Sequence, residues 1–144
     1  MERVDVVTGC RIHFGLAELY RGSQNCFAGI GLALAEPGFD LSLVSTTASP
    51  PIANRFTGPD YTEYHHRASA VLERCGLGEG WQVSFRSVLP LHHGLGAGTQ
   101  LAMAVAAACQ AVLKPGQPST EQLVALSGRG KRSAIGLCAF TGGG

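Results

Sequence analysis

Three glycines alternate along one short segment of the chain, and their spacing suits the binding of phosphate. Gly94, Gly96 and Gly98 stand between a strand-like stretch that ends near Leu89 and an alanine-rich stretch that is typical of a helix reaching Leu113. Glycine leaves the backbone open to a ligand and reaches positive φ at little cost. The first N–H groups of a helix lack partners within it, and the helix dipole adds partial positive charge there. Such a helix start is a seat for phosphate.

The predicted phosphate-binding residues of this segment run from the loop into the helix: Gly94, Leu95, Gly96, Ala97, Gly98 and Thr99. Thr99 would place a hydroxyl beside a phosphate or a bound cation. Tight packing between strand and helix is the alternative reason for such glycines. Thr99 favours phosphate binding over it, as do the small residues from 101 to 109, which let this helix lie close against a sheet. The segment differs from a Walker A loop, because no Lys-Ser/Thr pair follows its last glycine. It also lacks the Gly-x-Gly-x-x-Gly spacing of dinucleotide-binding folds.

A second segment with glycines carries positive charge. It reads Gly128-Arg-Gly-Lys-Arg-Ser-Ala-Ile-Gly136. Arginine makes forked contacts with planar anions, so this segment is a candidate for binding phosphate, pyrophosphate or a carboxylate. Its predicted phosphate-binding residues are Arg129, Lys131 and Ser133. A solvated basic loop is the alternative.

Size and composition indicate one compact domain and exclude several classes of partner. The chain has 144 residues, of which 45% are apolar and 15% charged, and its formal net charge is +1. No basic run supports nucleic-acid binding, and no stretch is long and apolar enough to span a membrane. The five cysteines form no Cys-x-x-Cys pair, which argues against a zinc site and a disulfide framework. We expect buried free thiols, no protein-held metal site, and a cytoplasmic location, since no signal peptide is visible.

The elements that must position these groups follow from periodicity and turn residues, and their order predicts an α+β fold. We expect strands over 3–8 and 10–16, a hairpin of a buried strand over 28–35 with its return over 39–45, and a helix over 60–75 ending at Gly76. A strand over 81–89 and the helix after the glycine loop follow. Ser119 or Thr120 starts a further helix with a capping box and an end near 127–128. An extended apolar stretch over 134–140 comes last.

Several of these motifs, in this order, resemble the GHMP kinase superfamily. Pro90-x-x-x-Gly-Leu-Gly-Ala-Gly98 resembles its second motif, usually Pro-x-x-x-Gly-Leu-Gly-Ser-Ser, which wraps nucleotide phosphates, and Arg11-Ile-His-Phe-Gly-Leu16 stands in the place of its first motif. Within the superfamily, the branch of the beta-ribofuranosylaminobenzene 5'-phosphate synthases is most similar. The segments that resemble this branch are 11–16, 28–34 and 129–136. Together with the glycine loop they span nearly all of the chain.

The resemblance implies a fold and a reaction. The fold is that of domain 2 of ribosomal protein S5, with a mixed sheet packed by helices, normally followed by a ferredoxin-like half. Because the chain ends in three glycines, we expect residues 1–144 to be the N-terminal part of a longer protein. The implied reaction belongs to methanopterin biosynthesis. It joins phosphoribosyl pyrophosphate to 4-aminobenzoate or a 4-hydroxy analogue and releases CO2 and pyrophosphate, with Mg2+ offsetting the pyrophosphate charge.

The predicted catalytic residues are His13, Arg11 and Arg132. Arg11 and His13 alternate on one strand and so share a face, and Arg132 would hold an anionic group of the substrate. His13 is the candidate acid or base, although a hydrogen-bonded core histidine is the alternative. Kinases of the superfamily carry an acidic residue near the position of Gly136, and its loss here disfavours phosphoryl transfer.

Two rival functions remain open. One is a small-molecule kinase that uses ATP on the same fold. The other is a non-catalytic fragment that binds anions or forms a homodimer through an unpaired apolar strand edge at 134–140.

Overall fold

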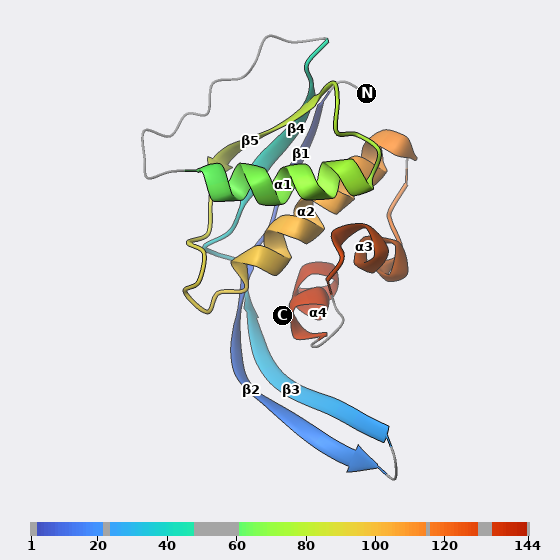
Figure 1. Ribbon diagram of the computed structural model, residues 1–144. Helices are drawn as coiled ribbons and strands as arrows, with labels where there is room; N and C mark the ends of the chain where they lie inside the picture. Colours follow the sequence, from blue (N-terminus) through green and yellow to red (C-terminus); the bar gives the residue numbers. More distant parts are fainter. Residues whose placement is uncertain (1–2, 22–23, 48–60, 115, 130–133, 144) are drawn as a thin grey trace.

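The chain folds into two antiparallel sheets and four helices over the described residues of the computed structural model, which are 3–21, 24–47, 61–114, 116–129 and 134–143 (Figure 1). The α+β class predicted from the sequence is confirmed. The elements are β1 (Arg3–Val7), β2 (Cys10–Arg21), β3 (Gln24–Leu34), β4 (Asp40–Ser45), α1 (Thr62–Arg74), β5 (Trp81–Ser87), α2 (Ala97–Leu113), α3 (Thr120–Ser127) and α4 (Ile135–Gly142).

The core lies between a three-stranded sheet and two helices. The sheet has the order β1-β4-β5, and α1 and α2 pack together against it, as Figure 1 shows. Leu41 and Leu43 of β4 and Phe85 of β5 turn their side chains into this core, where they are fully or almost fully buried. The predicted packing of the alanine-rich helix against a sheet is confirmed, because residues 101–106 of α2 are all buried. The start of α2 is thereby held in place.

The remaining two strands form a long ribbon that extends away from this body (Figure 1). β2 and β3 pair antiparallel from Cys10 opposite Leu34 to Arg21 opposite Gln24. The predicted hairpin between 28–35 and 39–45 is therefore wrong, as is the burial of 28–35, since most of these residues are exposed. The reason is a chain crossing: the Phe39 N–H donates to Thr8 Oγ1 at 3.1 Å and the Thr8 N–H to Phe39 O at 2.8 Å. This crossing carries the chain from the ribbon into the other sheet.

The expected mixed sheet is also corrected, because every strand pairing of the described residues is antiparallel. Both neighbours of β4, namely β1 and β5, run opposite to it. Local periodicity indicates that a segment is a strand but carries no information on its direction relative to a distant partner.

Residues 135–140 are helical and Ala134 caps their helix, whereas the sequence predicts an extended stretch over 134–140. The Cys138 N–H donates to Ala134 O at 2.8 Å within α4, and Gln100 Nε2 of α2 donates to Gly136 O at 3.1 Å. Leu137 and Phe140 pack against the core from this helix. Tertiary contacts thus override the extended pattern, and the apolar strand edge on which we based the homodimer does not exist there.

Local signals at two helix ends are confirmed. α1 ends where Gly76 adopts a left-handed φ of 73°. At α3, Ser119 Oγ accepts from the Gln122 N–H at 3.3 Å, and Gln122 Oε1 accepts from the Ser119 N–H at 2.8 Å. This reciprocal pair is the predicted capping box, and α3 ends before Gly128 as expected.

Four cysteines are free thiols, and three of these four are buried: Cys10, Cys75 and Cys109. Burial raises the pKa of the Cys10 thiol. Cys138 is exposed, so the expectation of a buried thiol is wrong there; it lies on an outward face of α4. Within the described residues, no helix combines the length and the apolar character that a membrane span requires.

Candidate anion-binding site

The glycine loop and the first turn of α2 present backbone donors to one place. Gly94 and Gly96 adopt φ values of 78° and 72°, which a side chain would strain. The N–H groups of Thr99 and Gln100 donate to Gly96 O at 2.9 and 3.0 Å, which starts the helix. The N–H groups of the two residues before Thr99 precede that first helical bond, so they have no carbonyl partner within the helix. No side chain caps this end, and its first turn has no acidic residue.

Arg11 is held against this loop by β2. Its backbone N–H donates to Leu95 O at 3.1 Å. A Cβ placed on Gly96 would lie 2.7 Å from Arg11 Cγ, and one placed on Gly136 would lie 3.1 Å from Arg11 Nε. The side chain therefore lies between these two glycines. Its Nε is buried and has no hydrogen-bond partner among the described residues. A buried charged donor left unpaired is costly, so this nitrogen is suited to an anionic ligand.

Two further arginines approach the same turn from other elements. A Cβ on Gly98 would lie 3.0 Å from Arg67 Nη1 and 3.6 Å from Arg129 Nη2. Arg67 belongs to α1, and Arg129 follows α3. Burial lowers the pKa of the Arg129 guanidinium, and the charges of Arg67 and Arg74 lower it further. The arginines thus repel one another in the absence of a ligand.

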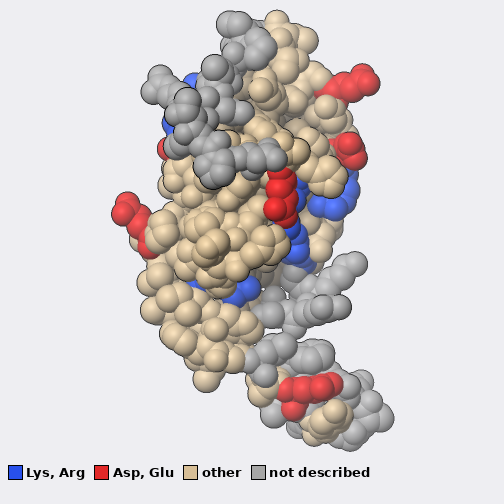
Figure 2. Space-filling model, turned by 60° about the vertical axis from the view of Figure 1, so that its left-hand side comes forward, with Lys and Arg blue, Asp and Glu red and all other residues tan. Residues whose placement is uncertain are grey.

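One carboxylate balances part of this charge. Arg67 Nε donates to Glu63 Oε1 at 3.0 Å, and His92 Nε2 lies 3.3 Å from the same oxygen. These two contacts lower the pKa of Glu63, with the Arg67 hydrogen bond as the larger cause. Neither Arg11 nor Arg129 takes part in an ion pair between described residues. Figure 2 shows basic side chains gathered near the middle of one face, with an acidic one beside them.

The predicted site residues divide into those that the structure brings together and those that it does not describe. The loop residues 94–99 meet Arg11 and Arg129 at the start of α2. His13 lies two residues after Arg11 on β2. Its Nε2 is buried, has no hydrogen-bond partner in the part of the chain that the structure describes, and would lie 3.2 Å from a Cβ on Gly29. Three predicted residues lie outside the described part of the chain: Lys131, Arg132 and Ser133.

Arg67 completes the cluster, although no sequence motif contains it. Its spacing from Glu63 is that of neighbours on one helix face, and this was the available signal. The spacing indicates that the two residues share a charged face of one helix, but it does not indicate which other element that face lies beside. The packing of α1 on α2 decides where that face lies, so Arg67 is found only in the folded chain.

The packing around Gly136 leaves no room for a carboxylate side chain at this position. Gly136 is buried at the start of α4, and a Cβ there would lie 2.9 Å from Thr99 Cγ2 as well as 3.1 Å from Arg11 Nε. An acidic side chain would therefore displace Arg11 or Thr99. Position 136 therefore accommodates the Arg11 side chain and cannot also hold an acidic side chain that would act as a base.

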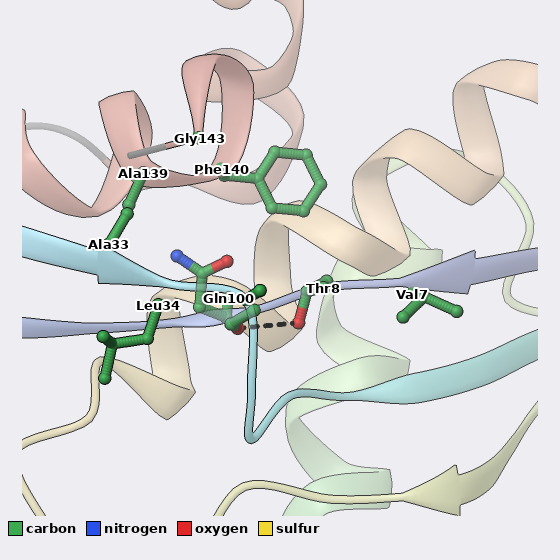
Figure 3. Close-up of a pocket in the computed structure, with 10 residues that line it drawn as sticks. Val7, Thr8, Ala33, Leu34, Gln100, Ala139, Phe140 and Gly143 are labelled. Carbon is green, nitrogen blue, oxygen red and sulfur yellow. Dashed lines mark hydrogen bonds between the residues drawn. The ribbon is translucent and has the colours of Figure 1, made fainter.

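A cavity of about 300 Å³ lies on another side of Gln100, between the ends of β1 and β3 and the helix α4 (Figure 3). Its lining is largely apolar, from Val7, Leu34 and Phe140, and Thr8 adds a hydroxyl. None of the three arginines lines this cavity. Among the described residues, no group of three or more His, Cys, Asp or Glu side chains could hold a metal ion.

Comparison with known proteins places this geometry in a family. Residues 63–144, more than half of the chain, match the GHMP kinases N terminal domain. The chain is 33% identical to beta-ribofuranosylphenol 5'-phosphate synthase of Methanocaldococcus jannaschii, covering 96% of this chain and 44% of that protein. It is 32% identical to the protein of the same name from Methanothermobacter thermautotrophicus, covering 95% of this chain and 43% of that protein. The chain thus spans less than half the length of these relatives.

One solved structure, that of 4-(cytidine 5'-diphospho)-2C-methyl-D-erythritol kinase, aligns with 85% of this chain and 46% of its own at 21% identity and a TM-score of 0.47. That score is too low to support an argument about the site. The assignment comes instead from the family match, which includes the glycine loop, α2 and the glycine that faces Arg11. The chain belongs to the GHMP kinase family, through the N-terminal domain that defines it.

Proposed function

We propose that this chain supplies the phosphate-binding part of a synthase that joins phosphoribosyl pyrophosphate to a hydroxybenzoate. The products are a ribofuranosylphenol 5'-phosphate, CO2 and pyrophosphate, in a step of tetrahydromethanopterin biosynthesis. The phenol product is chosen over the aminobenzene because the relatives at 32–33% identity are named for it. The proposal is for the whole enzyme, of which this chain corresponds to less than half.

The observation that supports it is the convergence of three arginines on the first turn of α2, with a glycine in place of an acid. Phosphoryl transfer to a hydroxyl uses a carboxylate to orient or deprotonate the acceptor. Gly136 offers none, and Arg11 Nε lies close to the space that its side chain would fill. Transfer of a ribosyl group needs instead a site that stabilises the departing pyrophosphate. Positive charge and unpaired N–H donors supply that stabilisation.

The proposed reaction balances without a net proton. The bond from ribose C1 to the pyrophosphate oxygen breaks, and C1 bonds to the ring carbon that carries the carboxylate. Loss of that carboxylate as CO2 returns an electron pair to the ring. We assign Arg11 to the leaving pyrophosphate, because its Nε lies buried beside the loop with no partner among the residues that the structure describes. His13 is assigned to the acceptor hydroxyl, since its Nε2 is also buried without a partner among the described residues.

Mg2+ belongs to this proposal as the counterion of the pyrophosphate. It prefers oxygen ligands and is usually bound through substrate phosphates with one or two carboxylates. Thr99 and Glu63 are the oxygen-bearing side chains of the described site, and Glu63 is engaged by Arg67 and His92. The described residues therefore do not form a metal cage.

Thermal unfolding of the 144-residue chain tests the proposal. Phosphoribosyl pyrophosphate with Mg2+ is compared with ATP and Mg2+ at matched concentration. A ligand at about 100 times its dissociation constant adds roughly 2.7 kcal/mol of stability, which corresponds to a Tm rise of about 5–10 °C for a domain of this size. We expect this rise with the sugar pyrophosphate. A rise with ATP alone would support the kinase instead. No rise with either would leave the loop without a role in binding.

A further inference from the structure

The two groups of arginines lie on different sides of the first turn of α2. Gly96 is the left-handed N-cap residue of α2, and Gly98 is the second residue of the helix itself. Gly96 faces Arg11, whereas Gly98 faces Arg67 and Arg129. The contacts of these two glycines therefore define two flanks of one helix end.

The Arg11 flank holds a buried guanidinium nitrogen and has no acidic partner among the described residues. It consists of Arg11, Gly96, Thr99 and Gly136. A Cβ on Gly136 would lie 2.9 Å from Thr99 Cγ2 and 3.1 Å from Arg11 Nε, which places Thr99 beside Arg11. Gln100, one position on, donates to Gly136 O at 3.1 Å and fixes α4 against this flank. The buried Nε of Arg11 is the donor that remains unpaired here.

The Arg67–Arg129 flank is more open and its charge is partly balanced. It consists of Gly98, Arg67 and Arg129, with Glu63 and His92 at its outer side. Glu63 accepts from Arg67 and lies 3.3 Å from His92 Nε2. Arg74 contributes charge from further along α1, although its Nε and Nη2 donate to the carbonyls of Leu126 and Ser127 at 3.1 Å. Two guanidinium groups at one glycine suit a phosphate monoester, which accepts forked hydrogen bonds.

We propose that the first turn of α2 separates two anion sites, one for each end of a substrate with a phosphate and a pyrophosphate. The pyrophosphate lies on the Arg11 flank and takes the free N–H groups of the turn. The phosphate monoester lies on the Arg67–Arg129 flank. This inference rests on the proposed function and specifies its substrate class: a doubly anionic sugar phosphate, rather than a nucleotide with one phosphate chain.

Calorimetric titration with the two halves of such a substrate tests the proposal. Inorganic pyrophosphate and ribose 5-phosphate are titrated into the 144-residue chain separately, and then each in the presence of the other. We expect both to bind at once. Arg11→Gln should weaken pyrophosphate about tenfold or more, which is the scale of a lost charge-assisted hydrogen bond, and leave ribose 5-phosphate within about twofold. Arg67→Gln and Arg129→Gln should give the reverse pattern.

Control variants distinguish the loss of a direct contact with the ligand from a change in net charge or a loss of folding. Lys114→Ala removes a positive charge at the far end of α2 and should change neither affinity by more than about twofold. Arg11→Lys keeps the charge without the Nε donor and should behave like Arg11→Gln if that donor matters. Far-ultraviolet circular dichroism and melting curves of each variant establish that it is folded.

Three outcomes would overturn the two-site inference. If pyrophosphate and ribose 5-phosphate exclude one another, or if every arginine variant weakens both equally, the turn holds a single site. Binding of phosphoribosyl pyrophosphate in the same experiment would then leave the proposed function standing. If neither half nor the intact sugar pyrophosphate binds, both proposals fail.

Discussion

Replacing Gly96 with alanine tests whether the glycine loop exists to accommodate Arg11. The left-handed φ of 72° at Gly96 costs a non-glycine residue about 1–2 kcal/mol. Alanine also restricts the unfolded chain, which returns about 0.4–1 kcal/mol. The new Cβ would lie 2.7 Å from Arg11 Cγ, near the base of that side chain, so Arg11 must move. Overpacking of this kind adds about 1–3 kcal/mol. We expect a total loss of about 2–4 kcal/mol.

Gly94→Ala is the matched control. Its φ of 78° carries the same backbone cost, but a Cβ there meets no atom within 4 Å. It should lose only about 1 kcal/mol, which lowers the Tm by about 2–4 °C in a domain of this size. Gly96→Ala should lower it by about 5–15 °C and bind pyrophosphate less tightly than Gly94→Ala does. Thermal unfolding in phosphate-free buffer and calorimetric titration measure both effects. Equal Tm values for the two variants, with equal affinity, would refute the packing of Arg11 on Gly96.

Three further predictions concern the rest of the fold. Ser119→Ala removes the capping box of α3 and should cost about 1 kcal/mol, or about 2–4 °C in Tm; an unchanged Tm would mean that the box contributes nothing. Hydrogen bonds from Arg3 above all, then from Ser42 and Arg86, hold the pKa of Asp5 well below its usual range. Because its folded pKa is lowered, Asp5 stabilises the fold above its unfolded pKa of about 3.9 and loses that effect as pH falls. Asp5→Asn should therefore flatten the acid side of the stability curve below about pH 4, by a small amount because Asp5 is half exposed, and a slope identical to that of the wild type would contradict this. Cys138 should react with a thiol reagent in the native state before the three buried described cysteines do, as peptide mapping after brief labelling would establish; faster labelling of a buried thiol would contradict the placement of α4.

The parts of the fold that the sequence predicts well depend on local chemistry. The start of α2 follows from glycines that precede an alanine-rich stretch. The capping box at Ser119 and Gln122 involves neighbours four residues or fewer apart, so its pattern is visible in the sequence. The glycine loop could be named as a candidate because its residue types suit phosphate. Arg11 could be named because it alternates with His13 on one strand and so shares a face with it.

The parts that sequence patterns do not predict depend on contacts between distant segments. The crossing of residues 38–39 over Thr8 decides that β3 pairs with β2 instead of β4. Residues 134–140 have an apolar composition compatible with either strand or helix, and packing against the ribbon and the core selects the helix. Arg67 enters the site only through the packing of α1 on α2.

In the proposed function, the first turn of α2 and its flanking arginines bind phosphoribosyl pyrophosphate. Backbone amide and arginine Nε resonances of the isotopically labelled chain, followed by NMR during titration with this ligand and Mg2+, test it most directly. We predict that the largest shifts occur at Ala97, Gly98 and the Nε of Arg11, with much smaller ones for ATP at the same concentration. Shifts confined to other parts of the chain, or equal shifts with ATP, would contradict the account.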